Sequence, residues 1–256
     1  MVKFLAALLV AGISHAFAYA GVVSGDGYEY NGAEMDTYNE VKKRSIEGGM
    51  TLNIMPTGAS ITFGINSSDG NGYRKDLENL LAGNPVNLIG TQHGGTMSDN
   101  ACEGYPGKRI GQVDSIIEGN NILSHKPNVI LINVGTNDCA QNFKVSGMPE
   151  RLSTFLGHIK SKAPNSVVIV SSLLPNRKAK VEQCVNTYNG ALPGVVAKAK
   201  AGGQKVFFVD MHAAVPLSDI STADGTHPND AGYKIMATKW HAAIVSAANE
   251  ISGAHS

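Results

Sequence analysis

A serine, a histidine and an aspartate suited to nucleophilic catalysis stand near opposite ends of this 256-residue chain. Ser60 closes the small-residue corner "TGAS" after an apolar run, and Asp224 precedes His227 by three residues in "DGTH". A serine hydroxyl becomes an effective nucleophile when an imidazole takes its proton. A carboxylate on a tight turn can orient that imidazole from its other nitrogen. We therefore expect Ser60 to be the nucleophile, His227 the base and then the acid, and Asp224 the residue that orients His227.

Attack of a serine on an ester carbonyl creates an oxyanion, which needs hydrogen-bond donors that are already in place. The backbone N–H of Ser60, the backbone N–H of Gly104 in "EGYPGKRI" and the side-chain amide of Asn137 in "GTND" are the candidate donors. Gly107 in the same stretch as Gly104 is the alternative. These donors would come from three separate loops.

Two other polar stretches compete for these roles. Asp210 and His212 in "DMH" offer a second acid and base, although they are less well placed than "DGTH". Asp138 has the chemistry of a catalytic acid, but as the residue after Asn137 it is expected to hold the loop by hydrogen bonds. We also interpret four histidines outside these motifs as structural or exposed, without partners; they are His93, His125, His158 and His241.

Short apolar runs alternate with helical periods along the chain. The runs are nearly continuously apolar, which is typical of strands covered on both faces, and they span residues 51–55, 86–90, 129–135, 167–173 and 205–210. Apolar residues spaced by three and four predict helices around residues 77–81, 152–159, 181–192 and 235–244. Strands that alternate with helices predict an α/β sandwich with a parallel sheet.

The predicted sheet gives the polar residues a common location. Ligands bind outside the carboxyl ends of the strands in open parallel sheets. Ser60, Gly104 and Asn137 each follow a predicted strand, and Asp224 and His227 follow the last one after a short loop. Each signal is weak alone, because Ser and Gly are common in ordinary turns. Together they predict one catalytic edge.

The motifs also resemble a known family in their order along nearly the whole predicted domain. "TGASITFG", "EGYPGKRI", "GTND" and "DGTHPNDAGY" are similar to the four blocks of SGNH hydrolases, also called GDSL-type esterases. Within that superfamily, "GASITFGINSSDGNGYRKDL" and "GTHPNDAGYKIMATKW" look most like the secreted carbohydrate-esterase branch, similar to carbohydrate esterase family 3 acetylxylan esterases. One departure is Ala59, which stands where the GDS signature has its aspartate. Any support that this aspartate gives the turn must come from elsewhere.

The resemblance implies a three-layer α/β/α sandwich with a five-stranded parallel sheet, the flavodoxin-like SGNH fold, over residues 49–256. It favours Gly104 over Gly107 as an oxyanion donor. It also implies a serine esterase that removes acyl groups, above all acetyl, from carbohydrate such as acetylated xylan. The alternatives are a general short-chain esterase or lipase and a catalytically silent carbohydrate-binding relative.

The amino-terminal residues have the pattern of a secretory signal. Residues 1–20 join a basic Lys3 to a short apolar run and to small-x-small cleavage patterns. Residues 21–48 are polar and rich in glycine, which predicts a flexible leader. Lys43-Arg44 within it is either a dibasic processing site or an ordinary basic surface patch. We expect a secreted, extracellular protein.

Three cysteines in a secreted chain predict one disulfide and one free thiol. The sequence does not choose the pair among Cys102, Cys139 and Cys184. Asn66 begins the only N-glycosylation sequon, "NSS", which predicts a surface loop close after Ser60 if the sequon is used.

The charge balance limits the partners of this chain. It carries 21 basic and 21 acidic residues, dispersed except at residues 42–44, so it has no electrostatic pattern typical of nucleic-acid or membrane binding. We expect a neutral acylated carbohydrate or small ester as substrate and a monomeric protein. The cysteine and histidine spacings do not indicate a metal site, and no cofactor is expected.

Overall fold

A central sheet carries the candidate residues. The computed structural model describes residues 22–23, 29–30, 46 and 49–251. The sheet has seven strands in the order β5-β6-β3-β7-β8-β9, with β4 also paired to β3. All pairs are parallel except β5 with β6. The strands are β3 Leu52–Gly58, β4 Val86–Leu88, β5 Gln92–His93, β6 Ala101–Gly104, β7 Val129–Asn133, β8 Val167–Ser171 and β9 Val206–Val209.

The expected parallel α/β sheet is confirmed, and the strand count needs a correction from five to seven. Strand β4 pairs with the first half of β3 and β6 with its last two residues, so both share one position beside β3. The parallel strands therefore fill five positions, and β5 adds a short antiparallel edge. Strands β5 and β6 were missed because runs of two and four residues are too short for a recognisable period.

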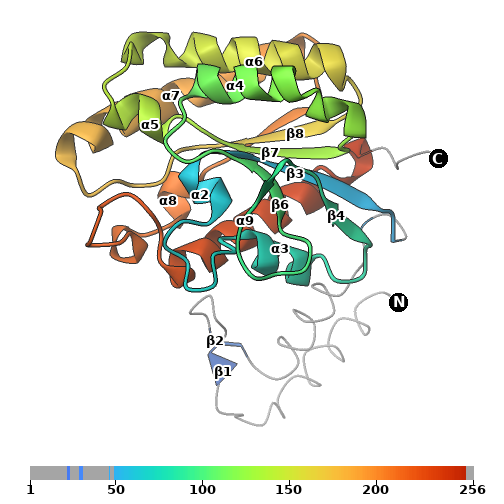
Figure 1. Ribbon diagram of the computed structural model, residues 1–256, viewed down its shortest axis with the longest axis horizontal. Helices are drawn as coiled ribbons and strands as arrows, with labels where there is room; N and C mark the ends of the chain where they lie inside the picture. The colour runs from blue at the N-terminus through green and yellow to red at the C-terminus, as the bar shows by residue number, and fades with distance from the viewer. Residues whose placement is uncertain (1–21, 24–28, 31–45, 47–48, 252–256) are drawn as a thin grey trace, which may run out of the picture. The chain divides into compact units, whose positions relative to one another are not determined.

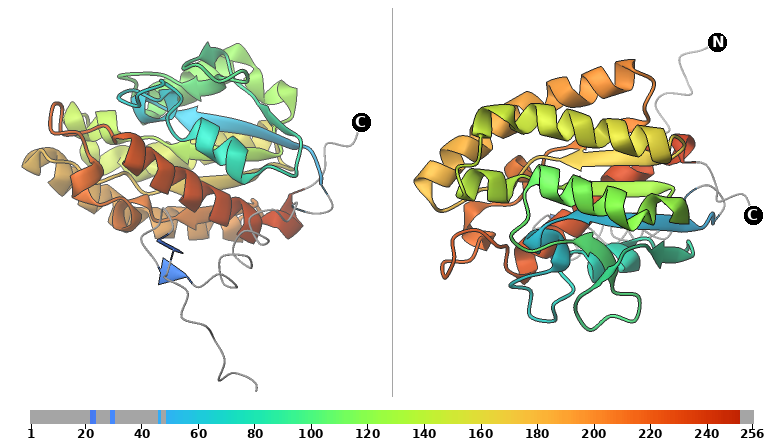
Figure 2. Two further views of the ribbon diagram at one scale, coloured as in Figure 1. Left: turned by 90° about the horizontal axis from the view of Figure 1, so that it is seen from below. Right: turned by 45° about the horizontal axis from the view of Figure 1, so that its top comes forward.

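Helices cover both faces of the sheet (Figure 1). The helices α4, α6 and α7 pack on one face, and α3 and α9 pack on the other (Figure 2). The helices are α2 Ser60–Phe63, α3 Arg74–Leu80, α4 Ile110–Asn120, α5 Thr136–Ala140, α6 Met148–Lys162, α7 Ala179–Ala201, α8 Met211–Ala214 and α9 Asp230–Ser246. Short 3₁₀ turns are η2 Ile122–His125, η3 Val145–Gly147, η4 Leu217–Asp219 and η5 Ala248–Glu250.

The pleat of the strands divides the core in two. In β7, Ile130 and Ile132 point to the α4/α6/α7 layer, whereas Val129 and Leu131 point to the α3/α9 layer. All four are buried, which explains why the strand reads as continuously apolar. Burying such a side chain contributes about 1.5–3 kcal/mol, so the two layers hold the sheet that positions the site.

The chain divides into two compact units, Met1–Lys42 and Lys43–Ser256. The first contains β1 Val22–Val23 paired antiparallel with β2 Glu29–Tyr30, a short pairing that the sequence did not predict. The expected signal at residues 1–20 and the dibasic pair at residues 43–44 lie outside the described residues. Among the helices that the structure describes, none has the length and apolarity to span a membrane.

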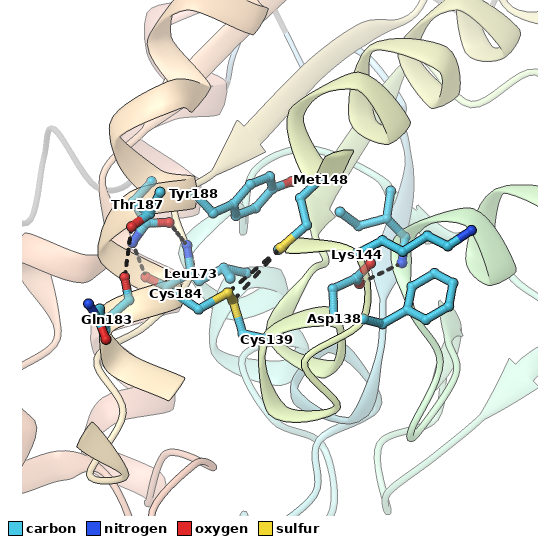
Figure 3. The surroundings of a disulfide bond; sticks show 12 residues. Asp138, Cys139, Lys144, Met148, Leu173, Gln183, Cys184, Thr187 and Tyr188 are labelled. Atoms are coloured by element: carbon cyan, nitrogen blue, oxygen red, sulfur yellow. Dashed lines mark hydrogen bonds between the residues drawn. A yellow bond between two sulfur atoms is a disulfide. The ribbon is translucent and has the colours of Figure 1, made fainter. Parts of the chain in front are cut away.

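The disulfide joins Cys139 of α5 to Cys184 of α7, with their Cα atoms 5.5 Å apart (Figure 3). Cys102 of β6 is the free thiol and is fully buried. Burial raises the pKa of the Cys102 thiol, against the lowering effects of the Arg74 charge and the Gly104 N–H. The expected count of one bridge and one thiol is confirmed.

Removing the disulfide should reduce the free energy of unfolding. The bridge closes a loop with a sequence separation of 45, and for such a loop the lost chain entropy corresponds to about 4 kcal/mol. We expect the Cys139→Ala/Cys184→Ala variant to unfold at clearly lower urea concentration. A reducing agent should shift the wild type by a similar amount and leave the variant unchanged. An unshifted reduced wild type would contradict this assignment.

Candidate active site

The corner that carries Ser60 is built by close backbone packing at the end of β3. Gly58, the last residue of β3, has no room for a Cβ, which would overlap the carbonyl oxygen of Asn133 and the hydroxyl of Thr62. Two main-chain bonds close the turn, from Phe63 N to Ala59 O at 3.0 Å and from Gly64 N to Ser60 O at 3.1 Å. Ser60 therefore begins α2 directly beyond the carboxyl end of β3.

Ala59 leaves the corner without a side-chain cap, because it provides no hydrogen bond to the start of α2. Its methyl group is buried, 6% exposed. The turn is instead held by the main-chain bonds above and by the Thr62 hydroxyl, which donates to the carbonyl of Thr57 at 3.4 Å. These contacts support the turn at Ser60, where the GDS signature has an aspartate in place of Ala59.

His227 connects Ser60 to Asp224. The His227 Nε2 atom lies 2.8 Å from Ser60 Oγ, although the two residues are 167 positions apart. The Nδ1 atom lies 2.8 Å from Asp224 Oδ2. Asp224 Oδ1 accepts the backbone N–H groups of Thr226 at 2.7 Å and His227 at 2.9 Å. The turn therefore fixes the carboxylate and the imidazole together.

The electrostatics keep Asp224 ionised. Partial burial alone would raise the pKa of its carboxyl, but the N–H donors of His227 and Thr226 and the imidazole outweigh it and hold the pKa below its usual 3.8. The side chain of His227 is 17% exposed and that of Asp224 38%. A charged carboxylate against Nδ1 favours the imidazole with its proton on Nδ1. Nε2 is then free to accept the Ser60 proton.

Asn137 and Gly104 flank the Ser60 corner. Strands β6 and β7 pair with β3 on opposite sides, with Gly104 and Asn133 both opposite Gly58. Asn137 lies on α5, just beyond β7, and its Nδ2 donates to the carbonyl of Lys108 at 2.9 Å.

Gly104 approaches the Ser60 helix closely. A Cβ on Gly104 would lie 2.6 Å from the backbone nitrogen of Phe63, so only glycine allows β6 to pack against α2. A Cβ on Gly107 would meet nothing within 4 Å. Gly104 ends strand β6 itself, whereas the sequence had suggested a loop after the second strand.

Asp138 holds two of these loops together. Its Oδ2 accepts the N–H of Ile110 at 3.0 Å, and its Oδ1 pairs with Arg151 Nη2 at 2.8 Å. Asp138 is fully buried. The interpretation of Asp138 as a structural residue is confirmed. Through it, the start of α4 is fixed to the helix that carries Asn137.

The model of the GDSL-like Lipase/Acylhydrolase family matches residues 57–235, which begin at the Ser60 corner and end beyond His227. The chain belongs to this family. The expected class, a carboxylic ester hydrolase of the GDSL family, is thereby confirmed.

Two relatives are similar to parts of the chain. A Multidomain esterase of Ruminococcus flavefaciens is 29% identical over 224 residues, 74% of this chain but 28% of that protein. A Putative endoglucanase X of Acetivibrio thermocellus is 29% identical over 146 residues, 56% of this chain and 61% of that protein. This GDSL-family chain thus spans less than two thirds of either.

Solved structures confirm the fold. A Clostridium thermocellum family 3 carbohydrate esterase is 30% identical, with a TM-score of 0.70 over 79% of this chain and 100% of that one. A carbohydrate esterase family 3 protein from Talaromyces cellulolyticus has a TM-score of 0.67 at 17% identity over 78% of this chain and 100% of that one. At that identity the second likeness concerns the fold alone.

Asp210 and His212, the alternative acid and base of this GDSL-family chain, form hydrogen bonds with other residues. Asp210 caps α8 by accepting the N–H of Ala213 at 3.1 Å and also accepts the Ser172 hydroxyl at 2.8 Å. His212 Nε2 lies 2.8 Å from Glu182 Oε1. Neither side chain is brought to Ser60. The structure therefore assembles "DGTH", not "DMH", with the serine corner.

The loop of residues 64–72, which carries the Asn66 glycosylation sequon, contacts the segment that follows His227. Asn66 Nδ2 donates to the carbonyl of Pro228 at 2.9 Å, next to His227. The N–H of Ser68 donates to Asp230 Oδ1 at 2.8 Å. Asn66 is exposed and has a left-handed φ of 75°. Loop 64–72 thereby braces the backbone that presents the imidazole.

Replacing Asn66 should loosen His227 without disturbing the backbone of the loop. Asn66→Gly tolerates the positive φ but removes the bond to Pro228, which is worth about 1 kcal/mol. We expect kcat to fall about 3- to 10-fold with little change in melting temperature. Steady-state kinetics on p-nitrophenyl acetate would measure this. The neighbouring Ser68→Ala, which keeps its backbone bond, is the control and should retain the wild-type kcat.

The expectation that the four histidines have no partners was wrong for His93, His158 and His241. His93 Nδ1 lies 2.9 Å from Asn100 Oδ1, and His241 also takes part in an interaction. His158 on α6 has a partner, Asp114 of α4, with 2.9 Å between Nδ1 and Oδ1. The hydrogen bond that His158 donates to Asp114 raises the pKa of His158, and the pair connects helices α6 and α4. With Glu118 the two residues place possible ligand atoms within 4.8 Å of one another. Because Nδ1 of His158 already bonds to Asp114, we interpret this cluster as an ion pair.

Proposed function

We propose that this GDSL-family chain is a secreted, monomeric serine esterase that removes acyl groups, above all acetyl, from carbohydrate such as acetylated xylan. The observation that carries the proposal is the hydrogen-bonded series of Ser60, His227 and Asp224, with 2.8 Å at each of its two links through the imidazole. That arrangement is what nucleophilic acyl transfer requires.

The reaction would proceed in two halves. His227 Nε2 takes the proton of Ser60 as Oγ attacks the ester carbonyl, and the imidazolium then gives the proton to the departing sugar hydroxyl. Asp224 stabilises that imidazolium through Nδ1–H. In the second half His227 takes a proton from water, which attacks the acyl-serine. The acid is released and Ser60 regains its proton.

Three donors would stabilise the oxyanion in both halves: the N–H groups of Ser60 and Gly104 and the Nδ2–H of Asn137. One Nδ2 hydrogen of Asn137 donates to Lys108 O, which orients the amide and leaves the second hydrogen for the substrate. The tight packing of Gly104 against α2 favours it over Gly107.

Removing the amide of Asn137 tests its role. Asn137→Ala should lower kcat/KM for p-nitrophenyl acetate about 10²- to 10³-fold, the effect expected of one lost oxyanion donor. The matched control is Gln141→Ala, which removes bonds to the same loop at Gly107 O and Arg109. If the control lost as much activity as Asn137→Ala, loop position and not oxyanion stabilisation would explain the effect.

The carbohydrate substrate is supported by the relatives, since the structural relative at 30% identity is described as a family 3 carbohydrate esterase. Acetate release from acetylated xylan by the purified protein, compared with hydrolysis of p-nitrophenyl esters of increasing acyl length, would test it. Release from xylan together with a preference for acetyl supports the proposal. Cleavage of aryl esters alone would favour a general short-chain esterase, and no cleavage would favour a silent carbohydrate-binding relative.

A further inference from the structure

We propose that Lys108, Arg109 and Lys144 form a cationic subsite beside Asn137 that binds a carboxylate of the substrate. The preferred substrate would then be an acetylated polysaccharide that carries uronic acid residues. This inference rests on the proposed function and goes beyond it by naming the charge of the substrate.

The subsite is created by two loops that meet at the catalytic edge. Residues 107–109 follow β6 and residues 141–144 follow α5, beyond β7, on opposite sides of β3. Asn137 Nδ2 donates to Lys108 O, and Gln141 Nε2 donates to Gly107 O at 3.0 Å. These bonds place Lys108 next to the proposed oxyanion donor.

Arg109 is held in a defined position above an aromatic ring. Its Nη1 donates to Gln141 Oε1 at 2.9 Å, and its guanidinium carbon lies 3.8 Å from the centroid of Phe143. Lys144 Nζ lies 5.7 Å from the same ring. The ring therefore gathers these two cations from different loops, together with Arg151, whose guanidinium carbon lies 5.4 Å from its centroid and which pairs with Asp138. Stacking on the ring orients the Arg109 fork.

The charges of these three residues have no acidic partner in the part of the chain that the structure describes. Among the described residues, none of them has an acidic group within salt-bridge distance. The neighbouring Asp138 is buried and already bonded to Arg151 and Ile110. In Figure 3, Asp138 and Lys144 lie on the opposite side of Cys139 from Cys184.

A carboxylate is the ligand that suits these groups. Arg forms paired hydrogen bonds with carboxylates, and exposed lysines add charge that steers an anion toward the site. The net charge of the chain is zero, and a neutral substrate was expected for this reason. The folded chain gathers cations locally, so the substrate need not match the net charge. In an acetylated polysaccharide, a uronic acid residue next to the acetylated sugar would carry such a carboxylate.

The test compares two substrates that differ in one group. Acetylated xylo-oligosaccharide bearing glucuronic acid is compared with the same oligosaccharide after reduction of the carboxyl to an alcohol. We expect kcat/KM for the wild type to be about 10-fold higher on the carboxylate at low salt, and the ratio to approach one in 0.5 M NaCl because salt screens exposed charges. Lys108→Gln/Arg109→Gln/Lys144→Gln should lose the preference.

A control variant removes the same number of positive charges from the edge of the sheet where the strands begin. Lys162, Lys198 and Lys200 are exposed in the last turns of α6 and α7, which lead into the amino ends of β8 and β9. Their triple replacement by Gln should retain the preference. Equal rates of the wild type on both substrates would overturn the subsite and leave the proposed function intact.

Two further outcomes also overturn the subsite. If neither oligosaccharide is deacetylated while p-nitrophenyl acetate is hydrolysed, the carbohydrate function fails and the inference falls with it. If the three cations instead accelerate only hydrolysis of short-chain phosphatidylglycerol vesicles, the site recognises an anionic lipid and not a uronic acid.

Discussion

Ser60→Ala should lower kcat for ester hydrolysis by about 10⁵- to 10⁶-fold, the size of effect seen when a serine nucleophile is removed from a catalytic triad. The methyl group has no proton to transfer to His227 and no lone pair to attack the carbonyl. Residual turnover would come from attack by water with help from the oxyanion donors. Acetate release from p-nitrophenyl acetate, followed with a large excess of enzyme, is sensitive enough to measure this loss.

The fold should survive this substitution. Ser60 is partly exposed and α2 is closed by main-chain bonds, so the free energy of unfolding should change by less than about 0.5 kcal/mol. Ser115→Ala, on the exposed side of α4, is the matched control and should keep full activity. If Ser60→Ala retained more than one per cent of the wild-type kcat, Ser60 would not be the nucleophile.

Asp224→Asn should lower kcat about 10⁴-fold, as the loss of the triad carboxylate does in other enzymes. In the variant, Oδ1 would still accept the N–H groups of Thr226 and His227, so Nδ2 would face Nδ1 of the imidazole. Nδ1 would then have to be the acceptor, which places the imidazole proton on Nε2. That tautomer has no lone pair at Nε2 to accept the Ser60 proton.

The control for this substitution is Asp219→Asn, which removes the same charge from a residue that does not contact His227. It should keep kcat within about threefold. A large loss in both variants would indicate that the charge of the loop, and not the tautomer of His227, matters for catalysis.

The main layers of the fold could be predicted from the sequence because their signals lie in short stretches of neighbouring residues. Buried parallel strands are apolar at nearly every position, as in β7 and β8, which become polar only at their last residues. Apolar residues of amphipathic helices recur every three or four residues. Strand β6 lacked such a signal because only four residues pair. The contact of loop 64–72 with the His227 segment could not be predicted in this way, because the bond of Asn66 to Pro228 joins residues 162 positions apart.

The sequence by itself determined what can be decided over a few residues: the alternation of strands and helices, the small-residue corner at Ser60 and the Asp224–His227 turn. Only the tertiary structure decided the contact of Ser60 with His227, the pairing of Cys139 with Cys184 and the meeting of Lys108 with Asn137. Each of these depends on how the strands and helices pack. Periodicity and turn preference are properties of neighbours in the chain, whereas distances between remote side chains are set by the whole core.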